Sequence, residues 1–257
     1  MSLLEVTDLT KNFGGLAALS NVNFYLNENE LVGLIGPNGA GKTTFFNLMT
    51  GVYVPSEGDI LLASDGKQIK LNGKKPYDIT DLGLARTFQN IRLFKDLSVI
   101  DNVMIALHSK KGVGTFHSIL RTPKFYQNDK TLREDAVELL KIFNLEEQTE
   151  SYARNLAYGE QRRLEIVRAL ATQPKILFLD EPAAGMNPQE TAELTDLIRK
   201  IQKQFKITVV LIEHDMSLVM NVCERIYCLE YGRLIAEGTP EEIKNNPEVI
   251  KAYLGGD

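Results

Sequence analysis

The segment GPNGAGKTT at residues 36–44 combines closely spaced glycines with a lysine and two threonines. It follows a continuous apolar run, LVGLI at 31–35, and it matches the pattern G-x-x-x-x-G-K-[ST] of a phosphate-binding loop. Glycines let backbone N–H groups converge on phosphate oxygens, and the helix after such a loop turns its positive N-terminus to the same anion. We expect Lys42 to contact the β- and γ-phosphates of a nucleotide and Thr43 to hold Mg²⁺. A strand-to-helix turn without a ligand would not require the Lys-Thr pair.

Two adjacent acids end the apolar run ILFLDE at 176–181. Burying a carboxylate is costly unless it serves a cation or a proton. We therefore expect Asp180 to hold the Mg²⁺ ion and Glu181 to orient and polarise an attacking water. A solvated loop is the alternative for such a pair, and the phosphate-binding loop upstream favours the catalytic interpretation.

Three further segments carry polar groups that can reach the same place. LIEHD at 211–215 ends another apolar run in His214, which can hydrogen-bond a γ-phosphate if its strand neighbours the first two. RTFQNIRLF at 86–94 contains Gln89, which can reach the metal or the water. LAYGEQRRLEIVRAL at 156–170 is a glycine followed by a basic amphipathic helix, whose N-terminus can meet an anion. By itself each has a structural alternative: a lone histidine, a loop glutamine or a surface helix.

Short apolar segments that would position these groups recur along the chain. Alternating apolar residues at 4–9 and 22–26 predict antiparallel strands near the N-terminus. The continuous run at 31–35 is typical of a strand that is buried on both faces. Further strands are predicted at 59–63, 176–179, 208–212 and 226–229, with an edge hairpin at 232–238.

Amphipathic segments fall between these strands. Ser98, Asn187 and Thr239 occupy predicted N-cap positions, the last two directly before a proline. Apolar residues at helical spacing predict further helices at 131–143 and 160–171. Strands that alternate with helices predict an α/β fold with a mostly parallel sheet.

One stretch breaks this alternation. From about residue 90 to 155 the strand signals vanish and helical patterns dominate, although 109–130 is polar and weakly periodic. We therefore expect a single domain, 1–257, with a core lobe at about 1–89 and 156–257 and a helical lobe at about 90–155 inserted into it.

The composition excludes several classes of protein. The chain has 257 residues and a formal net charge of −5, which argues against binding nucleic acid through bulk charge. No apolar run approaches the roughly 18 residues needed to cross a bilayer, and acids appear too early at the N-terminus for a secretory signal. Cys223 and Cys228 fit a reducing compartment, with no cluster around them that would suggest a metal site. We expect a cytosolic chain, or one bound to a membrane by a partner.

Taken in this order, the motifs resemble those of the ATP-binding subunit of ABC transporters, over nearly the whole chain. The resemblance implies a P-loop NTPase core that hydrolyses ATP with Mg²⁺. It implies ATP binding by the Walker A residues Gly36, Pro37, Asn38, Gly39, Ala40, Gly41, Lys42, Thr43 and Thr44. It also implies that Phe13 stacks on adenine, with a core-edge phenylalanine as the alternative.

The resemblance further assigns roles to the remaining motifs. It implies catalysis by Lys42, Gln89 of the Q-loop, the glutamate Glu181 and the switch histidine His214. Metal ligands would come from Thr43, Gln89 and Asp180, the last of these in Walker B. The signature motif at 156–161 would place Ala157, Tyr158, Gly159 and Glu160 on the ATP of a second chain in a head-to-tail dimer.

Finer features resemble one subfamily, the G-type ATP-binding subunit of bacterial branched-chain amino acid (Liv) importers. These features include EPAAGMNP at 181–188, LIEHDM at 211–216 and the tail GTPEEIKNNPEVIKAYLG at 238–255. The resemblance implies a second ATPase chain, identical or different, and two integral-membrane permeases. A periplasmic binding protein would deliver the amino acid, and the chain would lie peripherally on the cytoplasmic face of the inner membrane.

Two departures from the general ABC pattern bear on the chemistry. Ala157 replaces the serine of L-S-G-G-Q, and Asn187 replaces the aspartate that usually ends the D-loop. Without the serine hydroxyl, one hydrogen bond to the γ-phosphate is missing, so two different cassettes would have unequal ATP sites. The sites would be equivalent if the backbone N–H groups alone bind the phosphate well enough, or if the Tyr158 hydroxyl replaces the missing donor. A lipid or lipopolysaccharide exporter ATPase and a non-catalytic nucleotide-binding scaffold remain the alternative functions. A GTPase is not favoured, because no N-K-x-D motif appears.

Overall fold

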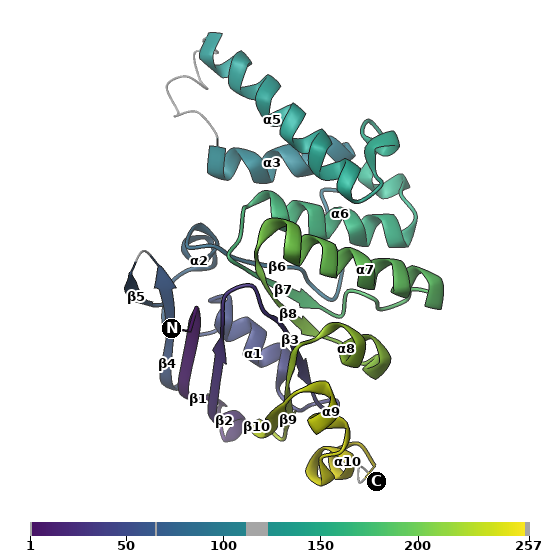
Figure 1. Ribbon diagram of the computed structural model, residues 1–257. Helices are drawn as coiled ribbons and strands as arrows, with labels where there is room; N and C mark the ends of the chain where they lie inside the picture. The colour runs from purple at the N-terminus through teal and green to yellow at the C-terminus, as the bar shows by residue number, and fades with distance from the viewer. Residues whose placement is uncertain (1, 65, 112–122, 255–257) are drawn as a thin grey trace.

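Two β-sheets form the base of the molecule in the computed structural model, which describes residues 2–64, 66–111 and 123–254 (Figure 1). The smaller sheet is antiparallel and has the order β2-β1-β4-β5. Its strands are β1 (Leu4–Phe13), β2 (Leu16–Leu26), β4 (Glu57–Ser64) and β5 (Lys67–Lys70). The expected antiparallel strands near the N-terminus are therefore present, extended and joined into one sheet.

The larger sheet has the order β10-β9-β3-β8-β7-β6. Its strands are β3 (Leu31–Ile35), β6 (Leu84–Arg86), β7 (Ile176–Asp180), β8 (Thr208–Ile212), β9 (Arg225–Glu230) and β10 (Arg233–Gly238). Every pair from β9 to β6 is parallel, and only β10 runs antiparallel at the edge. The prediction of an α/β fold with a mostly parallel sheet is confirmed. Strand order brings the carboxyl ends of β3, β8, β7 and β6 to one edge.

The central strands are buried on both faces, as their continuous apolar runs predict. Successive side chains of a strand point to opposite faces. Val32 and Phe178 face a core that also contains the first sheet and α1 (Lys42–Met49). Leu31 and Leu177 face the helices of the other side. Each face of the sheet therefore has its own hydrophobic core.

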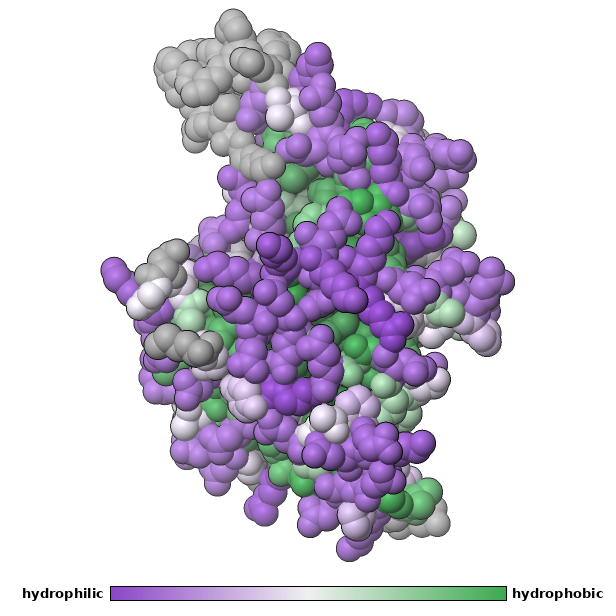
Figure 2. All heavy atoms as spheres, in the orientation of Figure 1, coloured by the Kyte–Doolittle hydropathy of each residue, from purple (hydrophilic) through white to green (hydrophobic). Residues whose placement is uncertain are grey.

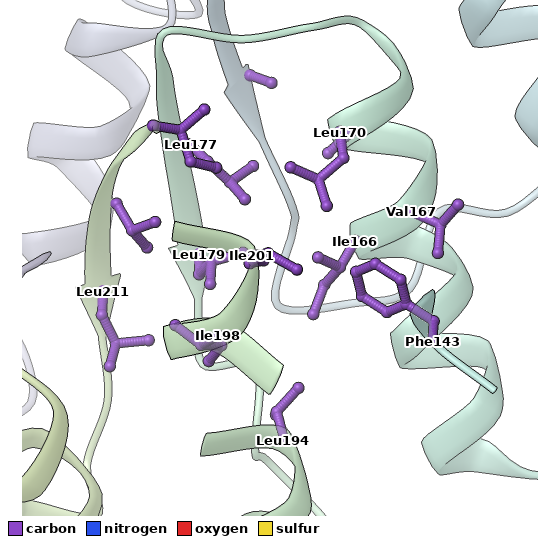
Figure 3. Close-up of a cluster of buried hydrophobic side chains, with 14 of the residues drawn as sticks. Phe143, Ile166, Val167, Leu170, Leu177, Leu179, Leu194, Ile198, Ile201 and Leu211 are labelled. Carbon is purple, nitrogen blue, oxygen red and sulfur yellow. The ribbon is translucent and has the colours of Figure 1, made fainter. Parts of the chain in front are cut away.

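Helices cover the second face and extend beyond it (Figure 1). The longer ones are α3 (Val99–Lys111), α5 (Pro123–Ile142), α6 (Tyr158–Ala171) and α7 (Pro188–Phe205). Shorter ones are α2 (Pro76–Asp81), α8 (Met216–Val222), α9 (Pro240–Lys244) and α10 (Pro247–Leu254). Figure 3 shows Ile166 and Leu170 of α6 and Ile198 of α7 directed at the β7 side chains. The layer of α6 and α7 thus packs directly on the strand that carries Asp180.

The part of 90–155 that the structure describes contains helices and an isolated bridge between Ser98 and Tyr152, without a named strand. The predicted cap is present, since Ser98 Oγ accepts the Asp101 N–H at 3.1 Å. α5 begins at Pro123, eight residues before the expected start at 131, because the sequence of its first turns has no regular apolar period. The rest of the polar stretch, 112–122, lies outside the described residues.

Among the described helices and strands, the sequence did not predict β5, α2, β6, α8 and α10. The KQIK sequence of β5 is polar and β6 has three residues, so neither shows a period of its own. Within the described residues no helix is long and apolar enough to cross a bilayer. Hydrophilic residues cover most of the face seen in Figure 2.

Candidate active site

The loop between β3 and α1 has a backbone that only glycine adopts easily. Gly36, Gly39 and Gly41 have φ angles of 147°, 79° and 105°. A Cβ on Gly36 would lie 2.1 Å from the Leu229 carbonyl oxygen. Gly41 is the N-cap of α1 and supplies no side-chain acceptor to the first turn. The first N–H groups of α1 are therefore left to an external anion, as the motif predicts.

Lys42 is buried beneath this loop. Its Nζ donates to the carbonyl oxygens of Gly36 at 2.6 Å and Pro37 at 3.0 Å. Burial lowers the pKa of Lys42 from its ordinary value, and the negative charges of Glu181 and Asp180 oppose that shift. A cation held in a desolvated loop interacts more strongly with a phosphate than it would in water.

Glu181 lies between Gln89 and His214. Gln89 Nε2 donates to Glu181 Oε2 at 2.8 Å, and His214 Nε2 lies 2.8 Å from Glu181 Oε1. These side chains follow β6, β7 and β8, which are neighbours in the sheet. Parallel strands present their carboxyl ends at one edge, where ligand sites of α/β sheets form. The fold therefore brings together three residues that are far apart in the sequence.

These three side chains and the phosphate-binding loop line one open cavity of about 490 Å³. From the predicted site it contains Asn38, Gly39, Ala40, Gly41, Lys42, Thr43, Thr44, Gln89, Glu181 and His214. The start of β2 (Leu16, Ala17 and Ala18) and the turn at Tyr231 and Gly232 complete the wall. The sequence analysis missed them, because neither segment carries a chemical motif. Gly36 and Pro37 do not line the cavity, and their carbonyl oxygens accept hydrogen bonds from Lys42.

Phe13 is the predicted site residue at the edge of this region. It ends β1, its ring is exposed, and it packs edge-on against Tyr53 at 5.2 Å between centroids. Phe13 itself is absent from the lining of the cavity, whereas Leu16, three residues on, lies in it. An exposed aromatic face next to the cavity is available to a flat apolar ligand.

Asp180 ends β7 and is buried, with Oδ2 accepting from Arg86 at 2.6 Å. Arg86 also donates to Asn47 at 2.6 Å, so it ties β6 to β7 and α1; the sequence analysis missed this residue. Among the described residues no group of three or more His, Cys, Asp or Glu side chains forms a metal cage. Mg²⁺ usually binds through one or two carboxylates plus substrate phosphates, so the oxygen donors of Thr43, Gln89 and Asp180 fit it.

The signature residues lie away from this cavity. Ala157, Gly159 and Glu160 line a separate hollow of about 520 Å³ beside α7. α6 starts at Tyr158, not at residue 160, so Ala157 is its N-cap, and its N–H donates to Glu160 Oε2 at 2.9 Å. The Tyr158 hydroxyl accepts from Arg162 at 3.3 Å and so points into its own chain. One chain therefore does not bring its signature residues to its own phosphate loop.

Asn187, where the D-loop ends, caps α7. Its side chain accepts the N–H groups of Gln189 and Glu190, both at 3.0 Å. Thr239 likewise accepts from Glu242 at the start of α9. Both predicted caps are confirmed, and the Asn187 side chain stabilises the N-terminus of α7.

The fold and this cavity define an ATP-binding cassette, and comparison with known proteins agrees. The sequence model described as "ABC transporter" matches residues 19–184. The chain belongs to the ABC transporter family, as an ATPase subunit. A second model, "Branched-chain amino acid ATP-binding cassette transporter", matches residues 233–257.

Individual relatives within this family differ in their sequence identity to the chain. The chain is 49% identical over 253 residues to the high-affinity branched-chain amino acid transport ATP-binding protein LivG of Escherichia coli, covering 98% of each chain. It is 47% identical to the corresponding protein BraF of Pseudomonas aeruginosa, again covering 98% of each. The lipopolysaccharide export ATP-binding protein LptB of Haemophilus influenzae is 34% identical, over 99% of this chain and 98% of LptB. A crystal structure of a nucleotide-free ATP-binding cassette from an ABC transporter matches with a TM-score of 0.83 and 30% identity, over 99% of this chain and all of that one.

Proposed function

We propose that this chain hydrolyses ATP to power the uptake of branched-chain amino acids through a membrane importer. The observation that carries the catalytic part is Glu181, whose two carboxylate oxygens face Gln89 and His214 at the mouth of the phosphate-loop cavity. The importer assignment rests on the greater identity to LivG and BraF than to LptB.

The site residues divide the chemical work. The N–H groups of the loop and the Lys42 ammonium bind the β- and γ-phosphates. Glu181 orients and polarises the attacking water, and His214 hydrogen-bonds the γ-phosphate. Thr43, Gln89 and Asp180 would hold Mg²⁺, which supplies charge neutralisation on the phosphates. For Asp180 to serve, its carboxylate must share or exchange the Arg86 contact.

Adenine stacks on Phe13 in this proposal, beside the cavity wall at Leu16. Ala157, Tyr158, Gly159 and Glu160 act on the ATP of a second cassette, because three of them, Ala157, Gly159 and Glu160, line a different hollow from the phosphate loop. The domain consists of the core lobe, 1–89 and 156–257, and the helical lobe, 90–155. The second cassette is either an identical or a different chain.

Two integral-membrane permeases complete the transporter, fed by a periplasmic binding protein, with this chain on the cytoplasmic face of the inner membrane. The permease docks in the region between Gln89 and α3. Phe94 and Leu97 are exposed there, and Tyr152 is exposed beside the bridge to Ser98. Apolar side chains rimmed by polar ones suit a partner helix. No nucleic acid is involved.

The experiment compares the full chain with Glu181→Gln, both assembled with their permeases in vesicles that contain leucine-loaded binding protein. We expect ATP to bind both proteins, with turnover and leucine uptake reduced about a hundredfold or more in the variant. Glu224→Gln, an exposed acid far from the cavity, is the control. Full turnover in Glu181→Gln would exclude the catalytic role. Stimulation by lipopolysaccharide in place of loaded binding protein would favour the exporter alternative.

A further inference from the structure

Glu213 is a buried carboxylate that the proposed mechanism does not use. It follows β8 directly, and only 4% of its surface is exposed. Oε1 accepts the Ala183 N–H at 2.7 Å, and Oε2 accepts the His214 N–H at 3.2 Å. No lysine, arginine or histidine side chain forms an ion pair with Glu213 in the described ranges of the chain. A carboxylate that is buried against two backbone N–H groups alone is an expensive choice for packing.

These two N–H groups belong to the two loops that carry the reacting side chains. Ala183 lies in the turn after β7, two residues beyond Glu181, and His214 lies in the turn after β8. The Glu213 carboxylate therefore joins the two loops inside the protein. Burial raises the pKa of Glu213, and the nearby charges of Glu181 and Asp215 act in the same direction, whereas the two N–H donors lower it.

The turn that begins at Glu181 is in an unusual conformation. Glu181 has a φ of 46°, a left-handed value that side chains other than glycine adopt only when the surroundings hold them. Its N–H donates to Ile212 O at 2.9 Å, which fixes the start of the turn to β8. The Ala184 N–H returns to Glu181 O at 3.2 Å. Among the described residues, the hydrogen bond from the Ala183 N–H to Glu213 is the one that joins the far side of this turn to the end of β8.

We propose that Glu213 is a positioning residue for ATP hydrolysis, which holds the Glu181 turn against the His214 loop. The inference rests on the proposed function, since it acts through Glu181. With this link in place, Glu181 keeps both oxygens 2.8 Å from their partners, Gln89 and His214. A displacement of about 1 Å at a reacting group can cost about a hundredfold in rate.

The test is Glu213→Gln in the full chain. Glutamine keeps the size and one acceptor, but it turns an NH₂ group towards one of the two N–H donors. We expect kcat for ATP to fall about tenfold to a hundredfold, while KM and the Kd for ATP stay within about twofold, because the phosphate loop is untouched. The melting temperature should change little, because removal of a buried charge offsets the loss of one hydrogen bond to a backbone N–H group. Glu224→Gln, the same substitution on an exposed residue eleven positions later, should leave every quantity unchanged.

A double variant separates positioning from general damage. If Glu213 acts through Glu181, then Glu181→Gln with Glu213→Gln should turn over no more slowly than Glu181→Gln alone. Glu213→Asp, one methylene shorter, should also lose kcat, because it reaches only one loop. Wild-type kcat in Glu213→Gln would overturn the proposal, as would a further loss in the double variant or a fall in kcat together with ATP affinity and melting temperature. Failure of the proposed function differs from all of these, because Glu181→Gln would then retain the wild-type rate.

Discussion

Arg162 in α6 is a buried cation whose removal should destabilise the folded chain strongly. Its guanidinium is completely buried, and it donates to Phe88 O at 2.6 Å, Gln89 O at 2.7 Å and Glu165 Oε2 at 3.1 Å. The other oxygen of Glu165 accepts the Arg92 N–H at 3.1 Å. The ion pair thus clamps the Gln89 segment onto the helix that carries the signature motif. We consider the substitution Arg162→Met.

Removing one partner of a buried ion pair leaves the other charge uncompensated, at a cost of about 3–5 kcal/mol. For a domain of this size each kcal/mol shifts the melting temperature by about 2–4 °C, so the expected loss is about 6–20 °C. Adding Glu165→Leu removes the stranded carboxylate. What remains is the loss of a donor to two carbonyl groups, which Arg162→Met alone also causes, and the loss of an acceptor for the Arg92 N–H, at about 1–3 kcal/mol for each group left unsatisfied. The double variant should therefore be more stable than Arg162→Met alone.

Thermal unfolding followed by circular dichroism measures these differences, with Arg163→Met as the control, since that neighbouring arginine is only half-buried. The pH dependence supplies a second signature. Burial raises the folded-state pKa of Glu165 above its unfolded value, and Arg162 opposes that rise. A raised pKa makes an acid's stability contribution largest at low pH and progressively lost as the pH rises through the folded value. The deficit of Arg162→Met should therefore shrink as the pH is lowered from about 8 to about 5. The reasoning would be refuted if Arg162→Met melted at the same temperature as Arg163→Met. It would also be refuted if adding Glu165→Leu lowered the melting temperature further.

Four further outcomes can be checked directly. Lys42→Ala should weaken ATP binding about tenfold to more than a hundredfold, from the loss of a charge-assisted contact of about 1.5–3 kcal/mol, and an unchanged Kd would contradict the phosphate assignment. Burial raises the pKa of Cys228 to about 12 and raises that of Cys223 too, so neither thiol should be alkylated near neutral pH until the chain unfolds, as mass spectrometry will show. Asn187→Ala should lower stability by about 1 kcal/mol through loss of the cap, and a wild-type melting temperature would argue against it. In a dimer with a different cassette, Ala157→Ser should alter ATP turnover at the partner's phosphate loop only. An effect seen only in dimers whose partner loop is disabled would show instead that the signature acts on this chain's own ATP.

Local patterns were sufficient for much of this fold. The predicted strands at 31–35 and 208–212 coincide with β3 and β8, because strands buried on both faces need unbroken apolar runs. The caps at Asn187 and Thr239 were also predictable, since each satisfies N–H groups two or three residues away. The phosphate loop at 36–44 was predictable for a similar local reason, because its glycines adopt positive φ angles that other residues rarely adopt.

The tertiary structure alone decided which distant groups meet. Gln89 and Glu181 are 92 residues apart in the sequence, and only the strand order β8-β7-β6 brings their side chains to 2.8 Å. Nothing in the sequence pattern distinguishes the buried Arg162 from the half-buried Arg163 beside it, because both lie in the same polar stretch of an amphipathic helix. Glu213 likewise precedes the predicted site residue His214, but it belongs to no motif that would single it out from the sequence. Burial and partnership of a polar group depend on what the rest of the chain packs against it, and that information is spread over all the elements around the group.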